Sequence, residues 1–239
     1  MHAERVRQPN WIHNQDDKTL KVVIARLYFN KMLMQFEDSF RRNIDMLQAS
    51  GLVENASITT TSGLAVDMAR NNVVSKNLDD FDAVIWLDTD MIYPDDAMCR
   101  LVQMHQAGYP IAAGVYRRAF KARDLLTEID EGCPATIEEL DALAKVSMPV
   151  KVEQTAGGYS IVSTELYRAI AAKIGHPWYC NFDFRYEHDQ CGEDRFFVRL
   201  ARQLGVYPYV DPTLTAVHWP PLSSPVPVRA DDPLLKWTV

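Results

Sequence analysis

Apolar and polar residues follow two different periods along the first half of this chain. Short, β-branched apolar runs that are typical of buried strands occur at residues 21–29, 56–61, 82–88 and 109–116. Apolar side chains at helical spacing occur between these runs, at residues 34–51, 62–78 and 94–108. This alternation of strand and helix predicts an α/β fold with a mostly parallel central sheet and helices on both faces.

Two of the expected helices contain further local signals. In the helix at residues 62–78 we expect Leu64, Met68 and Val74 to lie on or near one face. The next helix is expected to have Pro94 in its first turn, because proline fits the start of a helix, where its missing N–H is not needed.

The second half of the chain is less regular. Residues 117–150 predict an excursion over one edge of the domain that is partly helical, and residues 150–164 predict a strand, a glycine turn and another strand. We expect helices at residues 165–175 and 192–205, followed by extended chain at residues 206–220. Residues 1–19 are interpreted as an N-terminal arm, and the proline-rich residues 221–239 as a surface tail.

Composition restricts the class of protein. With 239 residues, 47% of them hydrophobic, the chain can form one large domain or two small ones and is long enough to bury a sizeable core. The net charge of −7 argues against broad, unspecific binding of nucleic acid. The four cysteines form no C-x-x-C pair, so they do not indicate a zinc knuckle. The N-terminus is polar and no apolar stretch reaches transmembrane length, so we expect a cytoplasmic protein with reduced thiols.

Asp88 ends the apolar strand "DAVIWLD", and Asp90 follows it two residues later. Ligands bind beyond the carboxyl ends of strands in parallel α/β sheets, so this position favours a site. Carboxylate oxygens suit Mg²⁺ or Mn²⁺, and such ions keep open positions for substrate phosphates. The alternative is a strand-end turn in which one aspartate caps the next helix, and a D-x-D pattern alone occurs often by chance.

Glu193 and Asp194 begin the predicted helix "GEDRFFVRLARQLG". Either acid could serve as a general base, while the structural alternative is the ordinary preference of carboxylates for a helix N-terminus. His218, in the rigid context "TAVHWPP", could be a metal ligand that suits Mn²⁺ better than Mg²⁺, although a lone histidine is more often structural.

Two further features fit either a ligand site or ordinary structure: the two are about even for Arg70, and for Gly157 and Gly158 taken alone a turn is the safer interpretation. Arg70, in "GLAVDMARNN", could bind a phosphate or a nucleotide carbonyl, or it could be an exposed arginine on a helix. Gly157 and Gly158, in "AGGY", could form a plain turn or a loop that lets a sugar approach the backbone closely.

The order of these segments resembles the GT-A fold glycosyltransferases, close to the large inverting family 2-like group. The segments that match are, in order, "MARNNVV", "LDTDM", "PDDAMCRLV", "AGVYRR", "GGYSIVSTELY", "GEDRFFVRLARQLG" and "VHW". The resemblance as a whole covers about residues 20–220. The resemblance implies a single-domain GT-A fold with a Rossmann-like central sheet. It also implies a nucleotide-sugar-binding half at residues 20–117 and an acceptor-binding, catalytic half at residues 118–220.

The resemblance implies roles for individual residues as well. Asp88 would lie near the ribose and the metal, and Asp90 would bind Mn²⁺ or Mg²⁺ with His218 as a further ligand. Asp194 would be the general base of an inverting transfer from a UDP-sugar, with Glu193 as the second candidate. Gly157 and Gly158 would border the donor sugar and the acceptor. The residues expected to contact the nucleotide are Ala25, Arg26, Arg70, Asn71 and Asp88.

The sequence departs from the family pattern in two places. Its first strand, "VVIARLYFN", lacks the usual proline-rich opening, and the excursion at residues 117–150 has no counterpart that we can place. The acidic pair at Glu193 and Asp194 favours inversion of the sugar without requiring it.

No membrane tether is present in the sequence, so we expect a soluble acceptor: a glycan, a protein, a small molecule or modified DNA. Small phage-type enzymes that glycosylate hydroxymethylated pyrimidines in DNA are similar in this respect. A basic group that could follow DNA phosphates consists of Arg117, Arg118, Lys121 and Arg123. Aromatic residues that could stack on a sugar or a flipped base are Trp178, Tyr179, Phe182, Phe184 and Tyr186. The alternative is a solvated basic loop beside an aromatic core edge.

Two other function classes remain open at this point. A nucleotidyltransferase would also use paired carboxylates and Mg²⁺ on an α/β sheet, but it should have a glycine-rich phosphate loop after the first strand, and "IARLYFNKM" contains no glycine. A non-catalytic sugar-binding module would not need Asp88, Asp90, Asp194 and His218 together.

Overall fold

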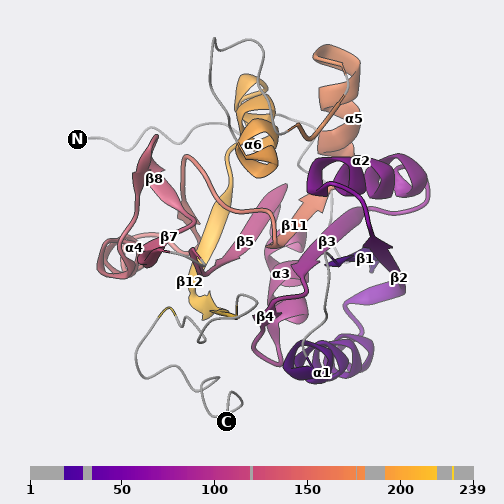
Figure 1. Cartoon of the computed structure of the whole chain (residues 1–239), viewed down its shortest axis with the longest axis horizontal. Coiled ribbons are helices and arrows are strands. Elements are labelled where there is room, and N and C mark those ends of the chain that lie inside the picture. The colour runs from indigo at the N-terminus through magenta and orange to yellow at the C-terminus, as the bar shows by residue number, and fades with distance from the viewer. Residues whose placement is uncertain are drawn as a thin grey trace.

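The computed structural model describes residues 19–28, 34–118, 121–175, 177–180, 192–219 and 228. A seven-stranded sheet forms its centre (Figure 1). From one edge to the other, the strands are β10 (Val150–Lys151), β12 (Tyr209–Thr215), β5 (Ile111–Val115), β11 (Tyr159–Ser163), β3 (Ala83–Asp88), β1 (Leu20–Tyr28) and β2 (Val53–Ser62).

Five of the seven strands of the central sheet run in the same direction. β1 is parallel to β2 and β3, and β12 is parallel to β5. The reversed strands are β11, which lies antiparallel between β3 and β5, and the edge strand β10. The predicted α/β fold with a mostly parallel sheet in a single domain is therefore confirmed, and the reversal of β11 is a feature that the sequence pattern did not indicate.

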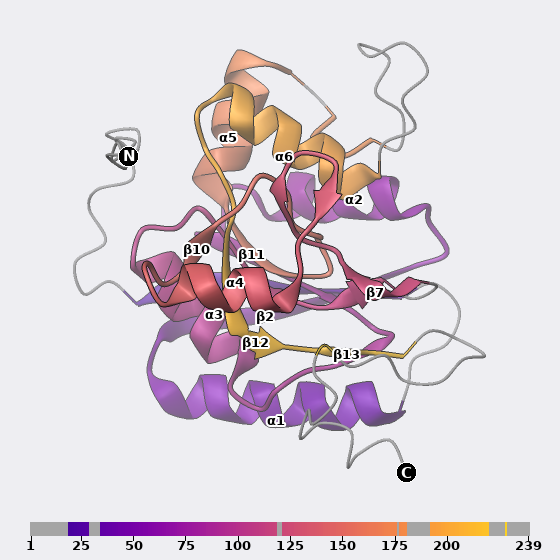
Figure 2. The same cartoon turned by 90° about the vertical axis from the view of Figure 1, so that its left-hand side faces the viewer.

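Helices cover both faces of the sheet, as Figure 2 shows. One face packs against α1 (Met34–Ser50) and α3 (Ala97–Gln106), and the other against α2 (Val66–Asn77), α5 (Thr164–Lys173) and α6 (Glu193–Gln203). Side chains alternate between the two faces along β3: Leu87 packs toward α1 and α3, and Trp86 toward α2 and α6. Asp88 lies two residues after Trp86 and therefore projects from the same face of the sheet, toward α2 and α6.

The predicted excursion forms a small subdomain beside β12. It contains β6 (Arg117–Arg118), β7 (Lys121–Leu125), β8 (Glu128–Asp130), β9 (Cys133–Pro134) and α4 (Ile137–Ala144). Thr136 and Glu139 form a capping box that starts α4, because each satisfies a backbone N–H of the other. Leu125 and Leu140 are buried with Val210 of β12 in a separate apolar cluster. The partly helical excursion is therefore confirmed.

Two local predictions were wrong. In α2 the buried stripe consists of Ala69, Arg70, Val73 and Val74, while Leu64 precedes the helix and Met68 is 58% exposed. Pro94 lies three residues before α3, and its N-cap residue Asp96 makes no side-chain capping bond.

Several predictions concern residues outside the described part of the chain. They are the arm at residues 1–18, most of the tail, and the aromatic side chains of Phe182, Phe184 and Tyr186. Among the described helices, none has the length and apolar character that crossing a membrane requires.

Candidate functional site

A short two-stranded ladder brings Asp90 and His218 together. β4 (Met91–Ile92) pairs antiparallel with β13 (Val217–His218), and the backbone N–H of Trp219 donates to the Asp90 carbonyl at 2.7 Å. As a result, His218 Nε2 lies 3.2 Å from Asp90 Oδ2, although 128 residues separate them in sequence. This contact joins the D-x-D segment to the late histidine.

The ring of His218 is held in one orientation. Its Nδ1 lies 2.8 Å from the carbonyl oxygen of Arg117 and can only donate there, which leaves Nε2 to face Asp90. The ring of Tyr116 packs edge-on against it. Burial alone would lower the pKa of His218, but the bond to Asp90 and the charge of that carboxylate raise it above its ordinary value. The carboxylate of Asp90 therefore favours a positive charge at the position of the His218 ring.

Arg70 lies at the centre of a second cluster. Its Nε donates to Glu193 Oε1 at 3.2 Å, and its Nη2 lies 3.6 Å from Asp88 Oδ1. The guanidinium is 1% exposed and stacks over the rings of Trp86 and Tyr179 at 4.9 and 5.6 Å. Burial lowers the pKa of Arg70, but the charges of Asp88 and Glu193 raise it by more, so the side chain stays protonated.

Asp88 lies between this arginine and the glycine turn. Burial, together with the charges of Asp90 and Glu193, raises its pKa to about 7, although the nearby charge of Arg70 lowers it. A Cβ atom at Gly158 would lie 1.8 Å from Asp88 Oδ2, and one at Gly157 would lie 3.0 Å from the Arg70 Cζ. The two glycines therefore allow the charged side chains to approach the backbone closely.

Tyr93 fixes the end of β3 to the same turn, a role that sequence reasoning missed. Its hydroxyl lies 2.8 Å from the Asp88 carbonyl oxygen and 2.9 Å from that of Gly158, and the Asp88 N–H donates to the Gly158 carbonyl at 2.9 Å. The hydroxyl of Tyr116 accepts the Gly158 N–H at 3.3 Å. The only signal in the sequence was the residue type, because a buried tyrosine needs a partner for its hydroxyl.

The two acids at the start of α6 point to different partners. Glu193 binds Arg70, whereas Asp194 accepts hydrogen bonds from the backbone N–H groups of Arg195, at 2.7 Å, and Gly157. Burial and the charge of Glu193 raise the pKa of Asp194 to about 6. Glu193 is thus occupied by an ion pair, while Asp194 is a carboxylate with raised proton affinity.

The predicted nucleotide contacts fall into two groups. Arg70 and Asp88 belong to the cluster just described. Ala25 is fully buried within β1, and Arg26 binds Glu37 and Thr60 on the α1 side of the sheet. Asn71 bonds the backbone of residues 178–179, which gives its amide a structural role. Nucleotide binding by Ala25, Arg26 and Asn71 stays a prediction.

The proposed acceptor residues are only partly described. The Arg117 guanidinium donates to the Val228 carbonyl oxygen, and the side chains of Arg118, Lys121 and Arg123 lie outside the described part of the structure. Trp178 and Tyr179 are buried among Tyr167 and Phe197, so they form the aromatic core edge that was the alternative interpretation.

Acidic groups outnumber basic ones in this region. The carboxylates are Asp88, Asp90, Glu193 and Asp194, and the described groups that can balance them are Arg70 and His218. Within the described residues, no group of three or more His, Cys, Asp or Glu side chains is arranged to hold a metal ion. Asp90 and His218 therefore form a candidate metal site of two residues, and Asp88 as a third metal ligand stays a prediction.

No family model and no curated protein sequence matches the chain. The solved structures that match its fold include A197 from STIV, with a TM-score of 0.56, and GalNAc-T7 with UDP, GalNAc and Mn²⁺, with a TM-score of 0.54. A197 is 15% identical over 84% of this chain and 86% of its own. GalNAc-T7 is 12% identical over 86% of this chain, but the match spans only 45% of the GalNAc-T7 chain. The chain therefore has a GT-A-like fold.

Proposed function

We propose that this protein is a metal-dependent glycosyltransferase that moves a sugar from a nucleotide sugar to a hydroxyl group with inversion. The observation that supports this most strongly is the Asp90–His218 pair beside Asp88, at the carboxyl end of β3 in a GT-A-like fold. The excess of carboxylates there favours a bound cation.

The residues of the pair fit a divalent metal. Adjacent ligands of an octahedral ion with bonds of about 2.1 Å stand about 3 Å apart, close to the 3.2 Å between His218 Nε2 and Asp90 Oδ2. The bond from His218 Nδ1 to a backbone carbonyl is the arrangement that orients a metal-binding imidazole. One oxygen and one nitrogen donor favour Mn²⁺ over Mg²⁺. When bound, the ion would neutralise charge on the departing diphosphate.

Asp194 is our candidate for the general base. It would accept the proton of the attacking hydroxyl while the acceptor oxygen bonds to the anomeric carbon and the bond to the diphosphate breaks. Its pKa of about 6 keeps it mostly ionised at neutral pH and raises its affinity for that proton. Glu193 is less suited to this role because its carboxylate binds Arg70 at 3.2 Å.

For the donor we propose a UDP-sugar. The similar GalNAc-T7 structure holds UDP, GalNAc and Mn²⁺, which makes UDP-GalNAc a reasonable first probe. For the acceptor we propose a hydroxyl group on a soluble molecule. Hydroxymethylated pyrimidine in DNA is the most specific candidate, because the basic residues of the segment 117–123 follow β5 in the sequence and could contact DNA phosphates.

A thermal-shift panel of nucleotide sugars with and without Mn²⁺ tests the proposal, because a ligand of the native state raises Tm. We expect a shift that needs both Mn²⁺ and one nucleotide sugar. That donor should then be turned over with hydroxymethylated DNA or a small hydroxyl acceptor. A folded protein that no donor stabilises would contradict the proposal, and a shift with nucleoside triphosphate and Mg²⁺ instead would favour a nucleotidyltransferase. Donor binding without turnover on any acceptor would favour a sugar-binding module.

A further inference from the structure

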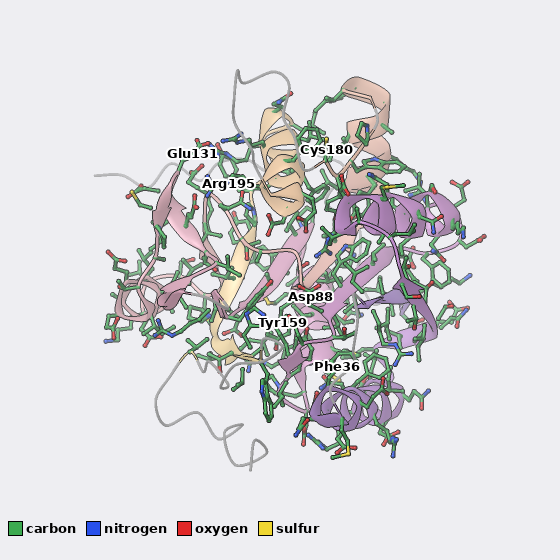
Figure 3. The ribbon with its side chains drawn as sticks, in the orientation of Figure 1. Phe36, Asp88, Glu131, Tyr159, Cys180 and Arg195 are labelled. Atoms are coloured by element: carbon green, nitrogen blue, oxygen red, sulfur yellow. The ribbon has the colours of Figure 1, made fainter. Side chains whose placement is uncertain are left out.

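The helix α6 is connected to the excursion by a row of ion pairs. Arg195, Arg199 and Arg202 recur at helical spacing and so share one side of the helix. Figure 3 shows Arg195 and Glu131 on the side of α6 that faces β8. The pairs are Arg195 with Glu128, Arg199 with Glu131 at 3.7 Å, and Arg202 with Glu131 at 3.3 Å and with Glu153 at 2.9 Å.

These pairs differ in burial. The Glu128 side chain is 7% exposed, whereas Glu131 is 52% and Glu153 28% exposed. Ion pairs in water contribute little to stability, but a buried carboxylate that loses its partner is left with an uncompensated charge. The pair of Glu128 with Arg195 is therefore the strongest connection between the excursion and α6.

Glu128 is itself fixed at both its backbone and its side chain. Its carboxylate also accepts the Gly132 N–H at 2.7 Å, and its backbone N–H donates to the Gln154 carbonyl at 2.9 Å. Gln154 lies three residues before Gly157, whose N–H donates to Asp194. Glu128 therefore contacts both the segment that leads into the glycine turn and the helix that begins at the acidic pair.

Arg195 connects Glu128 to the acidic pair, because its side chain binds Glu128 and its backbone binds Asp194. It follows Asp194 directly, and its backbone N–H donates to Asp194 Oδ1 at 2.7 Å. The Phe196 N–H donates to the Gly192 carbonyl at 3.0 Å and closes the first turn of α6. Any displacement of Arg195 would therefore move the Asp194 carboxylate relative to Gly157.

We propose that Glu128 and Arg195 are positioning residues, whose ion pair holds the first turn of α6, and with it Asp194, against the glycine turn at Gly157 and Gly158. This proposal rests on the proposed function, in which Asp194 is the general base. The proposal gives the excursion a role that its sequence did not indicate: it would hold in place α6, the helix that contains the proposed base Asp194.

The test compares Glu128→Gln with Glu153→Gln, a control that removes an ion pair two turns further along the same helix. For each variant, kcat and the KM of the donor are measured, and hydrogen exchange is followed in the peptide 192–197. We expect Glu128→Gln to lower kcat at least about tenfold, because small misplacements of reacting groups slow the chemical step strongly. The donor KM should stay within about twofold, exchange in that peptide should accelerate, and Glu153→Gln should change none of these.

A second variant separates positioning from loss of charge. Arg195→Lys keeps the positive charge but loses the fork of donors, and it should lower kcat less than Glu128→Gln does. Equal effects of Glu128→Gln and Glu153→Gln on kcat, or unchanged exchange in peptide 192–197, would overturn the proposal. If the wild-type protein transfers no sugar, the proposed function fails, and the exchange comparison still decides whether the pair anchors α6.

Discussion

The Nε of Arg70 donates to Glu193 Oε1 at 3.2 Å and so connects α2 to α6 across 123 residues of sequence. The same guanidinium lies 3.6 Å from Asp88, which belongs to β3. One buried cation thus joins three elements around the candidate site. Removing such a cation leaves two carboxylates without their partner, and this makes the contact a sensitive point for both stability and binding.

Substitution of Arg70 should therefore be costly. We expect Arg70→Lys to lower the free energy of unfolding by about 2–4 kcal/mol, because a point charge cannot replace a planar fork that serves two carboxylates and stacks on two rings. Urea denaturation measures this loss. Arg42→Lys is the matched control, since Arg42 pairs with the half-exposed Asp95 and should change stability by less than about 1 kcal/mol. Equal losses in the two variants would contradict the central role of Arg70.

The Asp90–His218 pair should control metal-dependent stabilisation. We expect Asp90→Ala and His218→Ala each to abolish the rise in Tm that Mn²⁺ and a nucleotide sugar produce together, and EDTA should abolish it in the wild-type protein. Isothermal titration with Mn²⁺ checks the affinity directly. Asp95→Ala removes an acidic side chain nearby in the sequence and should leave the shift in Tm intact. Full Mn²⁺ dependence in His218→Ala would remove His218 from the metal site.

Asp194→Asn should separate donor binding from transfer. We expect the donor-dependent shift in Tm to persist and kcat to fall at least about a hundredfold, which is the usual contribution of a general base. In the wild-type protein, kcat/KM should fall as the pH drops below about 6, where Asp194 becomes protonated. Near-normal turnover by Asp194→Asn would show that the base assignment is wrong.

The same carboxyl group should affect stability in a defined direction. Its pKa is raised in the folded protein, so the native state binds more protons than the unfolded chain, and stability increases as the pH falls from about 6 toward 4. Asp194→Asn removes this cost of ionisation and should stabilise the protein at pH 7.5 by about 1–3 kcal/mol relative to wild type. Chemical denaturation at pH 7.5 and pH 5 measures the difference, which should shrink at the lower pH.

His105 should have the opposite pH dependence. It lies in α3 at 3% exposure, and burial lowers its pKa to about 4, so the folded protein holds it neutral. The unfolded chain binds a proton first, and stability is therefore lost as the pH falls from about 6.5 toward 4. The free energy of unfolding that is lost on acidification should be smaller in His105→Leu than in the wild-type protein, by about 2–3 kcal/mol. A difference between wild type and variant that does not change between pH 7.5 and pH 4.5 would contradict the assignment.

The sequence by itself determined the main strands and helices and the position of Asp88 and Asp90 at a strand end. These features depend on local periodicity and on the boundary between an apolar run and a polar turn, which a short window of residues contains. The same local logic failed for Leu64 and Met68, because the neighbours of α2 decide which of its sides is buried.

Only the tertiary structure decided which of these residues meet. It placed His218 beside Asp90, buried Arg70 between Trp86 and Tyr179, and set Glu128 against Arg195. It also inserted β11 in reverse between β3 and β5, which brought Gly158 against Asp88. Most of these contacts join segments far apart in sequence, as the 128 residues between Asp90 and His218 illustrate. They follow from how the layers pack, and no local pattern specifies them.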